Sequence, residues 1–306
     1  MKHYCATQTQ ALLPFPALVD MLARTVRDYA GDTIACPERT TVPTHDGGGV
    51  LMCMPAVGAD LITTKLLTIF GANTALHLPA IQGTVTCADA HDGRFLFGLD
   101  GPTVTMRRTS AISMLAIRTF VHGHVRRVLV IGTGTQALAH VEALAALHPA
   151  IEVAIRGRTP DRAERFCTQH ATDRLTLRPE RAGAEDGFDV VITTTSSTTP
   201  IFDTPADARR LVIGVGAYRP DMAEIAPQVV RASQIYVDDP IGAPSEAGDI
   251  LQAGVPWGDV RALAQAFDTP RDPARPVFFK SVGCAAWDLA ACRVARDMQT
   301  RLSPEA

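Results

Sequence analysis

Apolar and polar residues alternate in short runs over the first third of the chain, a pattern typical of half-buried strands. After Pro16, apolar residues recur at helical spacing over residues 18–29 and predict one amphipathic helix. Strands are expected over residues 50–54, 61–70, 83–88, 94–99 and 103–106. Because Asp92-Gly93 and Asp100-Gly101 separate the last three runs at hairpin spacing, the pattern predicts an antiparallel meander.

The pattern changes near residue 110. A buried strand is expected over residues 125–131, where Val128 to Ile131 are all apolar, and strands and helices alternate from there. Further elements are expected as strands over 151–155, 189–193, 211–215 and 235–237 and as a closing helix over 285–301. Such alternation predicts βαβ units around a parallel sheet. We therefore expect a smaller domain over residues 1–112, joined by a C-terminal helix over 285–306, and a second domain over 113–284.

The composition is that of a globular chain, since 46% of the 306 residues are hydrophobic and 20% are charged. A formal net charge of −3 gives no bulk attraction to nucleic acid or acidic membranes, so neither is an expected partner. The apolar stretch at the N-terminus is short and broken by Pro14 and Pro16, unlike a signal peptide. The seven cysteines form no Cys-x-x-Cys pair, so we expect reduced thiols, no metal site and a cytoplasmic location.

A glycine-rich turn follows the first strand of the second domain, with the sequence Gly132-Thr133-Gly134-Thr135-Gln136-Ala137 and a helix expected over residues 137–147. In this G-x-G-x-x-A pattern Gly132 permits the tight turn, Gly134 lets a pyrophosphate approach the backbone, and Ala137 allows close helix–strand packing. The helix N-terminus itself favours phosphate. The context predicts a Rossmann dinucleotide site, and the alternative is a tight turn that binds nothing. The expected cofactor-binding residues here are Gly132, Gly134, Thr135, Gln136 and Ala137.

The residues that follow the strand expected over 151–155 indicate which cofactor is bound. An NAD-preferring site usually places Asp or Glu about 20 residues beyond the glycines. This chain instead has Arg156-Gly157-Arg158-Thr159, and no acid comes before Asp161. Guanidinium groups and a hydroxyl suit a 2′-phosphate. We therefore expect Arg156, Arg158 and Thr159 to bind the cofactor, with NADPH preferred and NADH as a second option; a solvated basic turn is the alternative.

Thr195 and Ser196 follow the strand expected over residues 189–193. Ligands of α/β sheets bind at the carboxyl ends of strands, so both hydroxyls are expected at the cofactor, with ordinary loop hydroxyls as the alternative. The expected fold class is therefore α/β, with a Rossmann NAD(P)-binding domain and a smaller α+β domain that contains the antiparallel meander.

Several segments together resemble the ornithine cyclodeaminase/μ-crystallin family. They are Arg39, Met54-Pro55-Ala56, Lys65 before Asn73, Asp89 to Gly93, Arg108 to Ala111, Gly132 to Ala137, Thr195 to Ser197 with Pro200, Gly216-Ala217 with Pro220 and Glu224, Glu246 to Asp249, and Ser281 to Gly283 with Asp288. The resemblance covers nearly the whole chain and keeps the family's order. It implies a homodimer in which the first domain binds substrate and forms the dimer and the Rossmann domain binds NAD(P).

One position discriminates among the activities that this family shares. Cyclodeaminases carry an aspartate directly after the Gly-Ala that matches Gly216-Ala217, and this chain has Tyr218 there. A phenol stays protonated at neutral pH and cannot replace a carboxylate base. The segments around Tyr218 and Trp287 also look like those of bacterial Δ1-pyrroline-2-carboxylate/Δ1-piperideine-2-carboxylate reductases. The resemblance thus implies NAD(P)H-dependent reduction of these cyclic ketimines to L-proline and L-pipecolate, with Gly216 and Tyr218 at the cofactor.

By the same resemblance, three cations serve the substrate. Arg39 is expected to clamp the substrate carboxylate, and Lys65, or a water beside it, to supply the proton. Arg108 is expected to contact substrate and cofactor, and Asp288 to balance the local charge, although an aspartate at a helix start is also an ordinary cap. Because one methylene changes binding by only about 1–3 kcal/mol, both ring sizes are expected as substrates.

Three alternative activities stay open at this point. They are ornithine cyclodeaminase, an alanine or N-alkyl amino acid dehydrogenase, and a non-catalytic NADP-linked binding protein. Two kinds of side chain are expected to lie at the surface without a catalytic role: Arg107, and the turn histidines His45, His91, His122 and His124.

Overall fold

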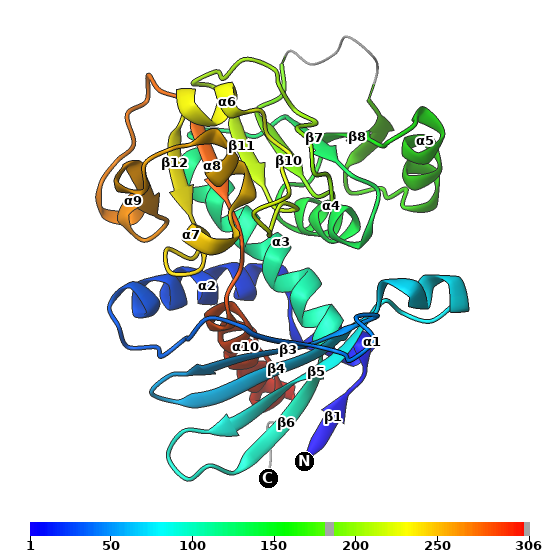
Figure 1. Ribbon diagram of the computed structural model, residues 1–306, viewed down its shortest axis with the longest axis vertical. Coiled ribbons are helices and arrows are strands. Elements are labelled where there is room, and N and C mark those ends of the chain that lie inside the picture. The colour runs from blue at the N-terminus through cyan, green and yellow to red at the C-terminus, as the bar shows by residue number, and fades with distance from the viewer. Residues whose placement is uncertain (181–186, 303–306) are drawn as a thin grey trace. The chain divides into compact units, whose positions relative to one another are not determined.

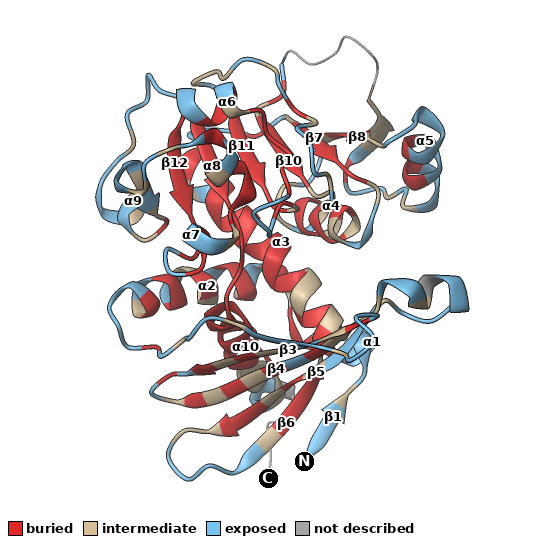
Figure 2. Cartoon of the chain, in the orientation of Figure 1, coloured by how far each residue is buried: buried red, intermediate tan, exposed pale blue. Residues whose placement is uncertain are grey.

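The computed structural model describes residues 1–180 and 187–302, and it divides into two compact units. The first unit joins Met1–Arg108 to the segment that starts at Cys284, and the second is Thr109–Gly283. Figure 1 shows that each unit is built on one sheet, and Figure 2 shows buried residues along both sheets. Within the described ranges, none of the helices is long and apolar enough to cross a membrane.

The sheet of the first unit has six strands in the order β1-β6-β5-β4-β3-β2. Their bounds are β1 Lys2–Tyr4, β2 Thr40–Pro43, β3 Val50–Val57, β4 Leu61–Ile69, β5 Ile81–Asp89 and β6 Phe95–Asp100. Strands β2 to β6 pair antiparallel, which confirms the predicted meander, and the short β1 pairs parallel with β6. The helical elements are α1 Ala6–Leu12, α2 Phe15–Ala30, the 3₁₀ turn Gly71–Leu76 and α10 Ala285–Leu302. Helix α10 packs against β3, β4 and α2.

The prediction of a strand over residues 103–106 is wrong, because these residues lie in the long helix α3, Gly101–Phe120. The carboxylate of Asp100 accepts hydrogen bonds from the backbone N–H of Thr103 at 2.8 Å and from its hydroxyl at 2.5 Å. Asp100 therefore acts as an N-cap that starts a helix. The Asp100-Gly101 dipeptide, which has the composition of a hairpin turn, is instead the boundary between β6 and α3.

The sheet of the second unit has eight parallel strands in the order β13-β12-β14-β11-β10-β7-β8-β9. Their bounds are β7 Arg127–Ile131, β8 Glu152–Arg156, β9 Thr176–Pro179, β10 Val190–Thr193, β11 Leu211–Gly214, β12 Gln234–Val237, β13 Val260–Ala262 and β14 Val277–Lys280. The parallel sheet confirms the predicted βαβ alternation. Strands β9, β13 and β14, which are three or four residues long, were not predicted.

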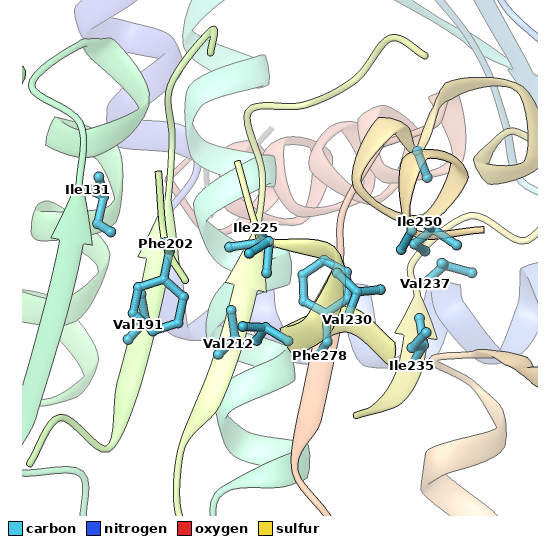
Figure 3. Packing of buried hydrophobic residues seen from close by; sticks show 14 of the residues in the cluster. Ile131, Val191, Phe202, Val212, Ile225, Val230, Ile235, Val237, Ile250 and Phe278 are labelled. Atoms are coloured by element: carbon cyan, nitrogen blue, oxygen red, sulfur yellow. The ribbon is translucent and has the colours of Figure 1, made fainter. Parts of the chain in front are cut away.

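Short helices connect these strands. They are α4 Thr135–Leu147, α5 Pro160–Gln169, α6 Pro227–Ala232, α7 Ala243–Glu246, α8 Gly248–Ala253, the 3₁₀ turn Trp257–Asp259 and α9 Gln265–Asp268. In the core shown in Figure 3, Val191, Val212 and Phe278 of three neighbouring strands pack with Val230 of α6 and Ile250 of α8. Every residue of β10, β11 and β14 is buried, as expected for a parallel sheet that is covered on both faces.

The strand order of the second unit reverses beside β7. The chain runs from β7 to β8 and β9 on one side, and then returns to β10 and β11 on the other. Ligands of open α/β sheets bind outside the carboxyl ends of the strands at such a reversal. The fold therefore places the candidate cofactor site at the carboxyl ends of β7, β8 and β10.

Candidate active site

The glycine-rich turn has the geometry that a pyrophosphate requires. Gly132 has φ +135°, and a Cβ there would lie 2.4 Å from the hydroxyl oxygen of Thr194, so only glycine fits. Gly134 is the N-cap residue of α4, and a Cβ built on it would meet nothing within 4 Å. The side-chain oxygen Oε1 of Gln136 is buried without a hydrogen-bond partner in the described part of the chain. An open cradle at a helix N-terminus, where backbone N–H groups are donors, fits the acceptor oxygens of a dinucleotide phosphate group. The Oε1 of Gln136 is itself an acceptor and adds nothing to this fit.

A cavity of about 540 Å³ lies at this edge of the parallel sheet. Its walls are Ile131, Gly132, Thr133, Gly134, Arg156, Gly157, Arg158, Arg162, Thr194, Thr195, Ser196, Ser197 and Ile201. The cavity thus brings together six of the predicted cofactor residues, namely Gly132, Gly134, Arg156, Arg158, Thr195 and Ser196.

The other predicted cofactor residues of the second unit lie outside that lining. Thr135, Gln136 and Ala137 form the first turn of α4, and Ala137 is buried as the packing argument requires. Thr159 is the N-cap residue of α5. The remaining two are Gly216, in the loop after β11, and Tyr218, which is 45% exposed.

The arginines at the end of β8 differ in their charge balance. Arg156 forms a two-pronged ion pair with Glu180: Nη2 lies 2.6 Å from Oε1, and Nε contacts Oε2. Arg158 and Arg162 also line the cavity, and neither forms an ion pair with a described residue. Arg162 was not predicted as a site residue, although its position in the first turn of α5, close behind Arg158, is a usable signal. Because Glu180 offsets Arg156, the uncompensated positive charge at the cavity comes from Arg158 and Arg162.

A second cluster of charges lies in the first unit. Lys65 belongs to the inward face of β4 and is 1% exposed. Its Nζ lies 2.9 Å from Oδ2 of Asp288, which is fully buried in the first turn of α10. Nε of Arg108, from α3, lies 3.5 Å from Oδ1 of the same carboxylate. The structure therefore brings Lys65, Arg108 and Asp288 together, as the resemblance implied.

The electrostatics of this cluster favour an anionic ligand. Burial lowers the pKa of Lys65 to about 8, the carboxylate of Asp288 opposes the shift, and the positive charges of Arg108 and Arg39 add to it. Arg39 is half-buried just before β2. Two cations, Lys65 and Arg108, thus contact the carboxylate of Asp288, and Arg39 is near enough to lower the pKa of Lys65. The Thr63 hydroxyl and the Nε of Arg108 are buried without a hydrogen-bond partner among the described residues, so polar groups remain for a ligand.

The expectation that Arg107 is a surface charge is wrong. Arg107 is 7% exposed, its Nε donates to the carbonyl of Leu13 at 2.7 Å, and its guanidinium lies 3.9 Å from the ring centroid of Phe15. The guanidinium stabilises the packing of α3 through a backbone hydrogen bond and a cation–π contact.

The histidines of the described chain carry no comparable site. His45, His91, His122 and His124 are exposed, as expected. His140 is fully buried, and burial lowers its pKa to about 4, so its ring is neutral between Ser113 and the carbonyl of Gln136. Within residues 1–180 and 187–302, no group of His, Cys, Asp and Glu side chains is arranged to hold a metal ion.

The parallel sheet, the glycine-rich turn and the basic end of β8 define a protein of the Rossmann class. The chain matches the ornithine cyclodeaminase/mu-crystallin family over residues 4–301, and it belongs to that family. It is 48% identical to the Δ1-pyrroline-2-carboxylate/Δ1-piperideine-2-carboxylate reductase of Azospirillum brasilense over 293 residues, which cover 95% of this chain and 94% of that protein. It is 32% identical to the mouse ketimine reductase mu-crystallin over 267 residues, 85% of this chain and 84% of that protein.

The fold is also similar to that of a solved structure. The structure of Thermococcus litoralis Δ1-pyrroline-2-carboxylate reductase in complex with NADH and L-proline matches with a TM-score of 0.89. The match covers 99% of this chain and 98% of that one, at 21% sequence identity. Similarity at this level of identity establishes a common fold.

Proposed function

We propose that this protein is an NAD(P)H-dependent oxidoreductase that reduces cyclic ketimines. The expected substrates are Δ1-pyrroline-2-carboxylate and Δ1-piperideine-2-carboxylate, and the expected products are L-proline and L-pipecolate. Relatives at 46–48% identity, which carry the name Δ1-pyrroline-2-carboxylate reductase, support this assignment. The observation that carries it is the buried cluster of Lys65, Asp288 and Arg108, because its chemistry meets the needs of an imino acid.

A cyclic ketimine acid presents a carboxylate next to a planar C=N bond. We propose that Arg39 and Arg108 bind the carboxylate, because guanidinium groups form charge-assisted hydrogen bonds with it that contribute about 1.5–3 kcal/mol each. Asp288 holds Lys65 at 2.9 Å and offsets part of the positive charge, so that an iminium cation can also be accommodated. The cluster thus matches both charges of the zwitterionic substrate.

The reaction adds a hydride to C2 and a proton to the ring nitrogen, and the C=N double bond becomes a single bond. The reduced nicotinamide cofactor, when bound, supplies the hydride. We propose that Lys65 supplies the proton, directly or through a water. With a pKa of about 8, its ammonium is still protonated near neutral pH yet gives up a proton more readily than an exposed lysine.

NADPH is the cofactor that we propose, with NADH as a second option. Arg158 and Arg162 place uncompensated positive charge at the cavity, and Thr159 is an exposed hydroxyl donor beside them. These groups suit the 2′-phosphate that distinguishes NADPH from NADH. The phosphates would lie against Gly132 and Gly134, and Thr195 and Ser196 would hydrogen-bond the cofactor from the opposite wall.

One spectrophotometric experiment tests the activity. Purified protein with NADPH and Δ1-pyrroline-2-carboxylate should lose the absorbance of reduced nicotinamide, and Δ1-piperideine-2-carboxylate should behave alike. Pyruvate with ammonia or with methylamine should react much more slowly. Absence of oxidation with either cyclic imine, using NADPH and NADH in turn, would overturn the assignment. Release of ammonia from ornithine without added reductant would instead indicate a cyclodeaminase.

We also propose that the first unit forms a homodimer through the sheet face that points away from α10. The register of β3, β4 and β5 places on this face Leu51, Cys53, Pro55, Val57, Ile62, Thr64, Leu66, Thr68, Gln82, Thr84, Thr86 and Ala88. None of these side chains is charged, and Leu51, Val57 and Leu66 are 39–43% exposed. An uncharged face of this kind, with exposed apolar side chains among threonines, is suited to protein–protein contact. One solved structure of this fold, an archaeal alanine dehydrogenase with bound NAD, is described as a dimer.

Sedimentation analysis tests the dimer. The wild-type protein should sediment with twice the mass of one chain, and Leu66→Lys should shift it toward the monomer, because a charge at the centre of an apolar interface is costly. Ile241→Lys, at an exposed apolar residue of the second unit, is the matched control and should leave the mass unchanged. A wild-type protein that sediments as a monomer at micromolar concentration would contradict the proposal.

We further propose that the protein works in the cytoplasm. All seven cysteines are free, and Cys87, Cys167, Cys284 and Cys292 are buried. Free thiols in this number fit a reducing compartment. Cell fractionation with detection of the tagged full chain tests this location.

A further inference from the structure

Glu224 is a fully buried carboxylate that the reaction proposed above does not use. It lies between β11 and α6, and its two oxygens accept three hydrogen bonds. The donors are the backbone N–H of Gly216 at 2.6 Å, the hydroxyl of Thr193 at 2.9 Å and the backbone N–H of Thr195. These donors come from the carboxyl ends of two neighbouring strands, β10 and β11. One side chain therefore joins the two loops that leave these strands.

A second layer of charged groups holds Glu224 in place. The carboxylate of Asp249 accepts hydrogen bonds from the backbone N–H of Glu224 at 2.6 Å and of Ile225 at 2.9 Å. Nζ of Lys280, at the end of β14, lies 3.0 Å from Oδ2 of Asp249, and both side chains are fully buried. Burial raises the pKa of Glu224, and the ammonium of Lys280 opposes that rise. Charge and hydrogen bonds thus fix the Glu224 carboxylate.

The two loops joined by Glu224 lie in close contact. A Cβ built on Gly216 would lie 1.9 Å from the carbonyl oxygen of Thr195 and 2.7 Å from Oε1 of Glu224. No side chain fits between them. Thr195, which donates to Glu224, is also a wall of the 540 Å³ cavity, together with its neighbours Thr194, Ser196 and Ser197. The position of this wall therefore depends on Glu224.

We propose that Glu224 is a positioning residue for cofactor binding, which rests on the proposed NAD(P)H-dependent function. Its carboxylate holds the backbone of Thr195 and Gly216 so that residues 194–197 form the wall of the cofactor cavity. A carboxylate can accept all three hydrogen bonds. The amide of a glutamine has one acceptor oxygen and one NH₂ donor, so at least one of the three donors would face another donor.

The test measures cofactor affinity directly, by fluorescence titration of the purified full chain with NADPH. Glu224→Gln should raise the dissociation constant for NADPH about tenfold, because loss of a buried charge-assisted hydrogen bond has about this effect. In kinetic assays the same variant should raise KM for NADPH and leave KM for Δ1-pyrroline-2-carboxylate within about twofold. A merely structural role would lower the melting temperature without this separation of the two KM values.

Asp238→Asn is the matched control. Asp238 is 2% exposed in the same unit and accepts hydrogen bonds from the hydroxyl of Ser281 and the backbone N–H groups of Val282 and Gly283. It does not line the cavity, so its variant should lower the melting temperature and leave the NADPH dissociation constant within about twofold. An equal loss of affinity in both variants, or wild-type affinity in folded Glu224→Gln, would overturn the proposal.

If Glu224→Gln does not fold, Thr193→Val carries the test, because it removes one hydrogen bond to the same carboxylate. A two- to threefold rise of the NADPH dissociation constant, about what loss of one neutral hydrogen bond gives, supports the proposal, and an unchanged constant overturns it. Titration also separates this proposal from the proposed activity. If the affinity for NADPH depends on Glu224 but the protein reduces no ketimine, only the proposed activity is disproved.

Discussion

Each unit of this protein contains one buried lysine–aspartate pair, and the two pairs have opposite surroundings. Lys65 and Asp288 of the first unit lie 2.9 Å apart, and Lys280 and Asp249 of the second lie 3.0 Å apart. All four side chains are at most 1% exposed. The distance and the burial are thus nearly the same in both pairs.

The neighbours of the two pairs differ. Two arginines add positive charge to the pair of Lys65, whereas the carboxylate of Glu224 adds negative charge near Lys280. Backbone N–H groups donate hydrogen bonds to Oδ1 of Asp249 and to Glu224. Both pairs nevertheless keep buried polar atoms without a hydrogen-bond partner among the described residues, namely Oδ2 of Asp249 and Nζ of Lys280 in one and Oδ2 of Asp288 in the other. An ion pair therefore does not define its own function. A pair whose neighbours add positive charge is suited to an anionic ligand, and a pair whose carboxylate accepts backbone N–H groups is suited to fixing the backbone.

The largest expected effect separates the two lysines. Lys65→Ala or Arg39→Ala should lower kcat/KM for Δ1-pyrroline-2-carboxylate about a hundredfold or more, or about 2.7 kcal/mol of barrier, because each removes a group that we propose contacts the substrate. Lys280→Ala should weaken NADPH binding and lower the melting temperature, with KM for the ketimine nearly unchanged. Steady-state kinetics on folded variants checks both. Near wild-type turnover in Lys65→Ala would remove that residue from the reaction.

A smaller effect is expected at the arginines of the cofactor cavity, where cations with and without an ion-pair partner can also be compared. Arg158→Ala and Arg162→Ala should each reduce the proposed preference for NADPH over NADH about tenfold, because each removes an uncompensated charge from the proposed 2′-phosphate site. Arg156→Ala is the control, since Glu180 already balances Arg156. The ratio of kcat/KM values for the two cofactors is the measurement. A larger change of this ratio in Arg156→Ala than in the other two variants would contradict the assignment.

The smallest expected effect is a displacement of the pH profile. If Lys65 supplies the proton, kcat/KM should fall above a pH of about 8, where its ammonium loses the proton. The carboxylate of Asp288 raises the pKa of Lys65, so Asp288→Asn should move this alkaline limb to lower pH. Asp249→Asn, at the other pair, should leave the limb in place. A limb that does not move in Asp288→Asn would assign it to another group.

Local patterns predicted much of the fold because they depend on neighbouring residues only. Alternating polarity gave the meander of β3 to β6, and continuous apolar runs gave the buried strands β7, β10 and β11. The wrong prediction of a strand over residues 103–106 also has a local cause. Asp-Gly fits both a hairpin turn and a helix start, and the hydrogen bonds of the Asp100 carboxylate decide between them.

The sequence by itself determined the family, the glycine-rich turn at Gly132 and the identity of the charged residues, since these are readable from order and spacing. Only the tertiary structure decided how each charge is used. Lys65 contacts Asp288, which is 223 residues away in the sequence, and Arg156 contacts Glu180, which is 24 residues away. Whether a cation is compensated depends on such distant partners and on burial, because both the Coulomb energy and the cost of desolvation depend on positions in space.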